Sequence, residues 1–239
     1  MRKLIATLLI IFAGAIAARS QTINDYLVEA GNFTELRVKN SINVEYVFSE
    51  DSLGIATFSA DSLTADALVF ENRKGKLTIS LEPRTYGRDH VIPTVTVRSN
   101  CLAYIANEGD STVRATPRVA ANSFKARLTG NGTLIVHDVR CEEVSAGIKF
   151  GGGSITISGL CDKASLSNTG SGSVIQAGEL QADKIACNLM GTGTIDCAPQ
   201  KELVVTGVGK GTVYYVGHPS IRNRAIGVKA VEVAAREDE

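Results

Sequence analysis

Two segments decide the fold, GNGTLIV at residues 130–136 and GGGSITI at residues 151–157. Both follow one pattern of glycine, a variable residue, glycine or serine, serine or threonine, and an aliphatic residue. Six copies have first glycines that are 21, 21, 19, 21 and 18 residues apart, at Gly109, Gly130, Gly151, Gly170, Gly191 and Gly209. This period is too short for a helical-hairpin repeat or a propeller blade, and the consensus of leucine-rich repeats is absent. It is typical of one coil of a parallel β-helix.

The residues around each glycine pair have the alternation of β-strands. Ser154-Ile155-Thr156-Ile157 follows one pair, and a strand-like run over residues 124–129 precedes another. One coil is therefore expected to contain a strand, a glycine corner, a second strand and a polar turn. Some aliphatic residues are expected to point inward and form ladders that no single coil could bury alone, namely Leu134, Val136, Ile155, Ile157, Val174, Ile195 and Val213.

Coil stacking explains why the corners contain glycine. Successive coils lie about 4.8 Å apart. A corner that requires a positive φ or a close backbone approach therefore recurs at the same place in every coil. Seventeen of the 23 glycines lie between Gly109 and Gly217. Glycine content thus follows the repeat and does not indicate a flexible linker.

The chain outside the repeat also has a β-strand pattern. Residues 33–105 alternate without the glycine motif, so they are expected to form irregular first coils. Residues 83–93 are expected to form an exposed loop, and residues 225–233 a closing strand. The fold class is all-β, with a single β-solenoid domain over residues 33–233, glycine-repeat coils over residues 106–217 and a lead segment over residues 21–32.

The first twenty residues have the features of a secretory signal peptide. A basic start precedes an apolar run over residues 4–18, which is shorter than the roughly 20 residues of a membrane-spanning helix. Small residues at Ala18 and Ser20 predict cleavage before Gln21, with residues 15–17 as the competing site. No second apolar run could cross a bilayer. The mature chain is therefore expected in the periplasm or on the outer-membrane surface.

Charge and cysteine content exclude several classes of protein. Lys plus Arg and Asp plus Glu number 25 each, so the basic excess of a nucleic-acid-binding protein is missing. Five cysteines without a Cys-x-x-Cys pair argue against a zinc site or a thioredoxin-type centre. Cys141 and Cys161 fall at equivalent turns of neighbouring coils. They could form a disulfide, because the coil spacing lies within the Cα window of about 4.4–6.8 Å, or they could remain stacked free thiols.

No catalytic, cofactor-binding or metal-ligating residues are predicted, and no cofactor is expected. A carboxylate-based β-helix enzyme needs acids on neighbouring coils of one face. Five aspartates are expected at different positions of the repeat, namely Asp110, Asp138, Asp162, Asp183 and Asp196. The histidines His90, His137 and His218 are far apart and lack metal-ligand spacing. All of these residues are expected to be solvated surface groups.

A binding surface would have to come from the outer residues of the coils. The variable corner residues would form a polar ridge, which fits either a recognition surface or a solvated corner, from Asp110, Asn131, Gly152, Ser171, Thr192 and Lys210. The aromatic residues that favour sugar stacking lie towards the ends of the repeat, at Tyr46, Tyr86, Tyr104, Tyr214 and Tyr215. A ligand site is thus expected near these ends or in residues 83–93.

Four motifs extend from Phe33 to about Gly217, and together they carry a family resemblance. They are the opening segment over residues 33–44, GKLTI at residues 75–79, Leu102-x-x-Ile105-x-x-x-Gly109, and the glycine repeats. With them the sequence resembles the "putative auto-transporter adhesin, head GIN domain" family of exported proteins, found mainly in Bacteroidetes-type bacteria. Ser111, at a place where glycine is expected, and the last coil at residues 226–228 depart from the pattern. The resemblance implies a right-handed parallel β-helix in the envelope or at the surface, without catalytic residues.

These observations favour a non-enzymatic, exported, adhesin-like interaction module of the envelope or cell surface. Its partner is expected to be an envelope protein or a glycan, which the sequence does not identify, and neither nucleic acid nor a membrane span is expected. One alternative is a carbohydrate-active β-helix enzyme, either a polysaccharide lyase or a hydrolase, which acids shared by neighbouring coils would favour. A third reading is a purely structural envelope protein without a discrete ligand.

Overall fold

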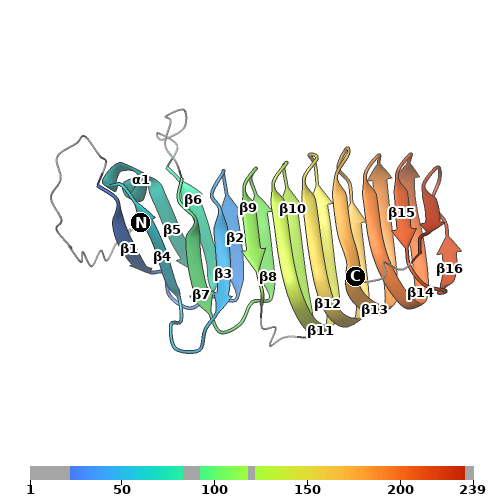
Figure 1. Ribbon diagram of the computed structural model, residues 1–239, viewed down its shortest axis with the longest axis horizontal. Coiled ribbons are helices and arrows are strands. Elements are labelled where there is room, and N and C mark those ends of the chain that lie inside the picture. The colour runs from blue at the N-terminus through green and yellow to red at the C-terminus, as the bar shows by residue number, and fades with distance from the viewer. Residues whose placement is uncertain (1–21, 83–91, 118–121, 235–239) are drawn as a thin grey trace.

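The computed structural model describes residues 22–82, 92–117 and 122–234, which form one elongated stack of β-coils (Figure 1). The predicted signal peptide and nearly all of the predicted 83–93 loop lie outside these residues. The stack runs from β1 (Asn24–Glu29) at one end to β16 (Ser220–Asn223) at the other. The prediction of an all-β solenoid is confirmed. No helix in the described ranges is long and apolar enough to span a bilayer.

The other elements are one short helix and fifteen strands. In chain order they are β2 (Glu35–Lys39), β3 (Val44–Phe48), β4 (Ile55–Ala60), α1 (Ser62–Ala67), β5 (Leu68–Arg73), β6 (Lys76–Leu81), β7 (Val95–Ser99), β8 (Tyr104–Glu108), β9 (Thr112–Ala115), β10 (Ser123–Thr129), β11 (Thr133–Lys149), β12 (Ser154–Asn168), β13 (Val174–Gly191), β14 (Thr194–Gly209), β15 (Thr212–Tyr215) and β17 (Lys229–Glu232).

The regular coils build two faces of the solenoid from parallel strands. The first face contains β3, β9, the N-terminal halves of β11 to β14, then β15 and β17. The second face contains β2, β8, β10, the C-terminal halves of β11 to β14, and β16. Register shifts lie between the halves of β11 to β13, where each strand turns from the first face to the second.

Aliphatic ladders fill the space between the two faces. Six of the seven residues predicted to point inward have no exposed surface, namely Leu134, Val136, Ile155, Ile157, Ile195 and Val213. The prediction for Val174 was wrong. Val174 pairs with Ser154 and is partly exposed, whereas Ile175 pairs with Ile155 and is fully buried. The motif spacing placed Gly172 at the second glycine position, but Ser173 occupies that position in this coil.

Close backbone approach explains the second glycine of the corners. A Cβ on Gly132 would lie 2.5 Å from the carbonyl oxygen of Ser111, and one on Gly193 would lie 2.8 Å from that of Ser173. On Gly153 it would collide with the carbonyl oxygen of Gly132. None of these glycines has a positive φ, which instead occurs at first-position glycines such as Gly130 (114°). Each second glycine is therefore required by the coil stacked before it.

Two corners use serine instead of this glycine, and each has a buried asparagine in the preceding strand. Asn168 donates from Nδ2 to the carbonyl oxygens of Ser173 (3.0 Å) and Thr194 (3.1 Å), and Ser173 Oγ donates to Asn168 Oδ1 (2.5 Å). Asn107 makes the corresponding bonds to the carbonyl oxygens of Ser111 (2.8 Å) and Thr133 (3.1 Å). In three other coils this position is aliphatic, at Leu128, Ile148 and Leu189, and in β14 it is Gly207.

The N-terminal coils do not follow chain order. Strand β2 lies between β6 and β8, and β3 lies between β7 and β9, so the first coil of the sequence is enclosed on both sides. Beyond β6 and β7, the strands β5 and β4 add in antiparallel orientation, and β1 pairs with β4. The strands predicted as irregular first coils are therefore part of the solenoid, but the antiparallel pairs were not predicted.

An aromatic stack and α1 cover the core at the β1 end. Tyr26 stacks on Phe58 with ring centroids 5.2 Å apart, and Phe58 on Phe70 at 5.9 Å. The helix begins after Asp61, whose side chain accepts hydrogen bonds from the backbone N–H groups of Leu63 and Thr64. The opposite end has no comparable cover among the described residues. All four residues of β16 are exposed there.

Candidate functional site

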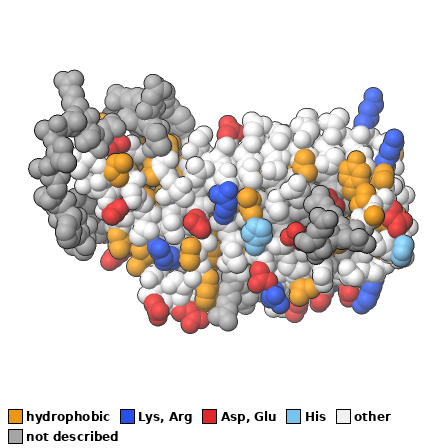
Figure 2. All heavy atoms as spheres, viewed as in Figure 1, with side chains coloured by type: hydrophobic (Ala, Val, Ile, Leu, Met, Phe, Trp, Pro, Cys, Tyr) orange, Lys and Arg blue, Asp and Glu red, His pale blue; other side chains and the backbone are white. Residues whose placement is uncertain are grey.

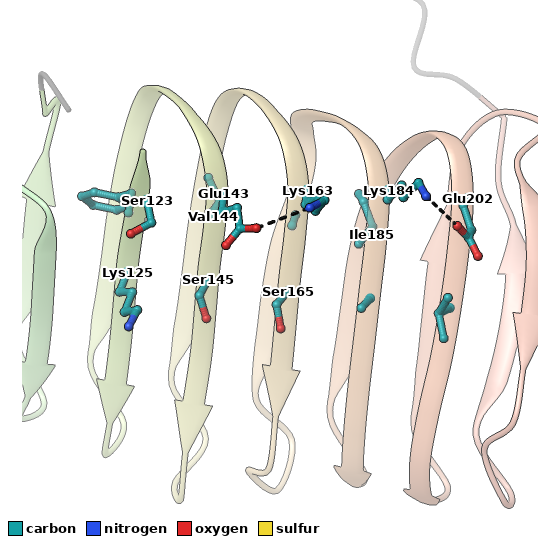
Figure 3. A pocket seen from close by; sticks show the side chains of 14 residues that line it. Ser123, Lys125, Glu143, Val144, Ser145, Lys163, Ser165, Lys184, Ile185 and Glu202 are labelled. Atoms are coloured by element: carbon teal, nitrogen blue, oxygen red, sulfur yellow. Dashed lines mark ion pairs between the residues drawn. The ribbon is translucent and has the colours of Figure 1, made fainter. Parts of the chain in front are cut away.

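A shallow, open groove of about 560 Å³ crosses the second face from β10 to β14 (Figure 3). Its lining residues come from five successive strands, so the groove extends along the solenoid axis. Two rows of outward-pointing side chains define it. The charged row is Ser123, Glu143, Lys163, Lys184 and Glu202, and the second row is Lys125, Ser145, Ser165, Ala186 and Val204.

The charged row places two lysines side by side. Lys163 and Lys184 are direct register partners, and like charges at such positions repel each other. Each lysine forms an ion pair with the glutamate on its other side. Lys163 Nζ lies 3.5 Å from Glu143 Oε1, and Lys184 Nζ lies 3.5 Å from Glu202 Oε2 (Figure 3). The centre of the row therefore has two neighbouring lysines whose side chains extend in opposite directions, each towards its own glutamate (Figure 3).

Glu202 is shared between two cations. Besides Lys184, the Nε atom of Arg222 in β16 lies 3.6 Å from Glu202 Oε1. The Lys163–Glu143 pair is exposed at both side chains, and such pairs contribute less than about 1 kcal/mol to stability. The Glu202 side chain is only 21% exposed, so its ion pairs are better shielded from water. The two exposed lysines can therefore exchange their present partners for those of a ligand at little cost to the fold.

Small side chains give the groove its depth. Ser145, Ser165 and Ala186 have short side chains. Gly147 follows Ser145 by two residues on β11, so it lies on the same face of the strand. The Arg127 guanidinium lies over Gly147 and donates from Nη2 to Ser145 Oγ (3.1 Å) and from Nη1 to the Ser145 carbonyl (3.3 Å). A Cβ on Gly147 would lie 3.0 Å from Arg127 Nη1. Arg127 therefore adds a cationic group beside the N-terminal end of the groove, where Lys125 also lies.

The polar ridge predicted at the corners uses part of its hydrogen-bonding capacity internally. Asp110 Oδ1 accepts from the backbone N–H of Asn131 (3.0 Å), and Asn131 Oδ1 accepts from that of Gly152 (2.9 Å). These bonds join the first three corners of the ridge. They agree with a solvated corner more closely than with a free recognition surface.

The aromatic residues do not gather into a site among the described residues. Tyr46 is buried, and its hydroxyl contacts the Ser99 carbonyl and Ser99 Oγ, both at 3.1 Å. Burial raises the pKa of Tyr46. Tyr214 is 38% exposed near the C-terminal end, while Tyr86 lies outside the described residues. The groove lies on the side of the solenoid between the ends where a site was expected.

One premise about the acids was wrong. Cys161 pairs with Ala182 and Lys163 with Lys184, so Asp162 and Asp183 do occupy equivalent positions on neighbouring coils. The Asp-Lys dipeptide at residues 162–163 and again at residues 183–184 could have revealed this alignment in the sequence. Within the described ranges, no group of three His, Cys, Asp or Glu residues could hold a metal ion. Asp183 instead pairs with Lys201, at 2.6 Å from Nζ.

The two described histidines lie at different places on the surface. His137 Nδ1 is 3.3 Å from Ser158 Oγ at the polar turn. His218 Nδ1 is 3.2 Å from Glu232 Oε1 in the last coil. His90 lies outside the described residues. Each described histidine therefore has one local partner and no second histidine beside it.

Cys141 and Cys161 are register partners on β11 and β12, as the sequence alignment of the turns predicted. Both are free thiols, so of the two alternatives the structure has stacked thiols and not a disulfide. Cys141 Sγ donates to the carbonyl oxygen of Glu143 at 3.2 Å. Burial, followed by the neighbouring Cys141, raises the pKa of Cys161 to about 12. Burial also raises the pKa of Cys141.

A second cysteine pair lies inside the solenoid and was not predicted. Cys187 points inward from the second face and Cys197 from the first, and both are buried. The hydrogen bond between the two thiols, together with burial, raises the pKa of Cys187. Both cysteines are free thiols and serve as small core residues.

Residues 32–219 match the family described as "Putative auto-transporter adhesin, head GIN domain". The chain belongs to this family. The match begins one residue before Phe33 and ends two residues after Gly217, close to the limits of the resemblance in the sequence. No curated protein matches the GIN-domain chain.

Solved structures share the fold at low sequence identity. A "putative adhesin" from Bacteroides fragilis is 18% identical, with a TM-score of 0.80 over 90% of this chain and 98% of that chain. A "putative lipid binding protein" from Parabacteroides distasonis is 20% identical, with a TM-score of 0.69 over 87% and 96%. A "putative adhesin" from Parabacteroides merdae is 18% identical, with a TM-score of 0.69 over 88% and 96%. At these identities the likeness concerns the fold alone.

Proposed function

We propose that this GIN-domain chain is a non-enzymatic, exported interaction module of the bacterial envelope or cell surface. The adhesin description of the family supports this function, and the signal-peptide pattern of residues 1–20 supports export. In this proposal cleavage precedes Gln21, and residues 33–233 act as one rigid domain that presents its side to a partner.

The groove is the proposed binding surface, and its ligand is an extended polymer that bears acidic groups. The observation that carries this proposal is the lysine pair, Lys163 and Lys184, flanked by Glu143 and Glu202. A ligand carboxylate, sulfate or phosphate placed between the two ammonium groups would relieve their repulsion. The open ends of the groove favour a chain that continues along the solenoid axis. Both an acidic envelope glycan and an acidic segment of an envelope protein have this chemistry.

The test is a binding titration with matched variants. The probes are a uronic-acid polysaccharide, a neutral polysaccharide of similar length, and acidic proteins extracted from the envelope. Replacing both groove lysines, Lys163→Gln with Lys184→Gln, should weaken binding of the acidic probe by about tenfold or more, since two charge-assisted contacts are lost. Lys149→Gln is the control, because Lys149 is exposed on the same strand as Glu143 but outside the groove.

The outcomes separate the three readings of the sequence. Equal binding of acidic and neutral probes, or an unchanged affinity in the double variant, would refute the groove as an acid-binding site. Turnover of a polysaccharide that Asp162→Asn or Asp183→Asn abolishes would instead establish the carbohydrate-active enzyme. Binding to none of the probes would leave the structural envelope protein as the best reading.

A further inference from the structure

Both ends of the solenoid present strands with an unpaired edge. Among the described residues, β17 pairs only with β15 and β16 only with β14. At the other end, β1 pairs only with β4 and β5 only with β6. An unpaired edge exposes backbone N–H and C=O groups that another strand can bind.

The two ends carry opposite charge. Segments 22–34 and 49–67, which include β1, β4 and α1, contain six Asp or Glu residues and no Lys or Arg. The strands β15, β16 and β17 with their connections, residues 212–232, contain three Lys or Arg residues and one Glu, Glu232, which gives this end a net positive charge. On the face shown in Figure 2, Asp and Glu side chains predominate towards the left, whereas side chains of both charges occur at the right-hand end.

The strand directions at the two ends are compatible with continued stacking. β1 is antiparallel to β4, and β4 is antiparallel to β7, which is parallel to the strands of the first face. β1 therefore runs in the same direction as β17. A copy shifted along the solenoid axis would place its β1 beside β17 as a further parallel strand.

The outward side chains of the two edge strands are complementary. Along β1, exposure alternates so that Asp25, Leu27 and Glu29 point outward. On β17, Lys229 and Val231 point outward, in register with Thr212 and Tyr214. Leu27 is 40% exposed and Val231 is 36% exposed, so an apolar contact is available next to the charged one. Asp25 is held at the edge by a 2.6 Å hydrogen bond from Ser59 Oγ.

We propose that the partner of these ends is a second copy of this chain, joined head to tail. β17 of one copy extends the first face of the next copy by pairing with its β1, with Lys229 beside Asp25 and Val231 beside Leu27. Pairing of like ends is opposed by charge, because Arg222, Arg224 and Lys229 would face their own counterparts. A head-to-tail contact does not close on itself, so the copies form open linear assemblies.

The test uses charge reversal at both ends of the purified chain. Light scattering and sedimentation should show a mass that rises with protein concentration and falls with added salt. Asp25→Lys and Lys229→Glu should each weaken self-association by about tenfold or more, because like charges then meet at every junction. Lys149→Glu is the matched control, an equal charge change in the middle of the solenoid, and it should leave association unchanged.

Mixing the two reversed variants decides the geometry. In a head-to-tail assembly, each junction of an alternating chain pairs opposite charges, so the mixture should regain association that neither variant has alone. The double variant, Asp25→Lys with Lys229→Glu, should likewise associate within about threefold of the original chain. A chain that stays monomeric at all concentrations would overturn the proposal. If mixing the two variants does not restore association, the proposal is overturned as well, and that result would indicate pairing of like ends.

Discussion

At the glycine corners, the backbone of one coil occupies the space that a side chain of the next coil would need. The space beside Gly132 is taken by the carbonyl oxygens of Gly109 and Ser111, and beside Gly153 by that of Gly132. The same contact recurs between successive coils along the stack. The corner is thus a packing constraint between neighbours as well as a local turn.

The first prediction compares two adjacent corner residues. Gly132→Val should lower the free energy of unfolding by about 1–3 kcal/mol or more, because the added atoms overlap backbone that cannot move independently. Asn131→Val should have a smaller effect, because Asn131 is exposed and loses mainly its hydrogen bond to the Gly152 N–H. Urea titrations of both variants provide the measurement. Equal unfolding midpoints would show that close stacking at residue 132 does not limit the fold.

The buried asparagines provide a second residue-scale prediction. Asn168→Ala should destabilise the chain by about 1–3 kcal/mol, since the carbonyl oxygens of Ser173 and Thr194 lose a buried donor. Asn188→Ala is the matched control, because Asn188 is the exposed register partner of Ser167 in the neighbouring strand. Thermal unfolding of the two variants should therefore differ clearly. A larger loss for Asn188→Ala would contradict the role of the buried amide.

At the scale of the strands, the thiols at the paired turns of β11 and β12 make the free energy of unfolding depend on pH in the alkaline range. Above the ordinary thiol pKa of 9.0, Cys161 in an unfolded chain ionises, whereas the folded chain keeps its proton up to about pH 12. The contribution of this thiol is therefore fully present below pH 9 and is lost as the pH rises towards 12. Cys161→Ser should make the free energy of unfolding less steeply dependent on pH between 9 and 11. Unfolding curves of both forms across that range give the answer, and identical slopes would exclude the effect.

Strand positions and corners could be predicted from the sequence because they depend on local patterns. The alternation around Ile155 and the corner at Gly132 give the coil, its inward residues and its approximate length. Val174 shows the limit of this reasoning, since a serine replaces the glycine that sets the register and only pairing with Ser154 settles the alignment.

The groove depends on relations between coils that a motif search does not compare. Lys163 and Lys184 become neighbours only when the polar turns are aligned as well as the glycines, and the turns differ in length from coil to coil. The flat position of Arg127 depends on Gly147, a glycine outside the repeat motif. The order of β2, β6 and β8 was likewise out of reach, because the chain before residue 105 has no repeated glycine motif that would show which strands are neighbours.

For the whole molecule, backbone amides should lose their protection from hydrogen exchange first at one end of the stack. β12 and β13 have partners on both sides in both faces, whereas β16 and β17 each have one described partner and mostly exposed residues. Hydrogen exchange should therefore be fastest in the amides of β16 and β17 and slowest in β12 and β13. Mass spectrometry of exchange in dilute protein, where copies stay apart, tests this. Uniform protection along the solenoid would mean that it unfolds as a single cooperative unit.

The enclosure of β2 and β3 between later strands constrains the order in which the chain can fold. These strands emerge early during synthesis and export, yet β2 has no neighbour on either side until residues 76–81 and 104–108 have followed. The N-terminal third must therefore assemble as one nucleus from contacts distant in sequence, which is intrinsically slow. The later coils need only add to a finished edge, one after another. A chain interrupted near residue 60 would thus be a ready target for proteases and chaperones, whereas one interrupted after β12 would already hold a folded core.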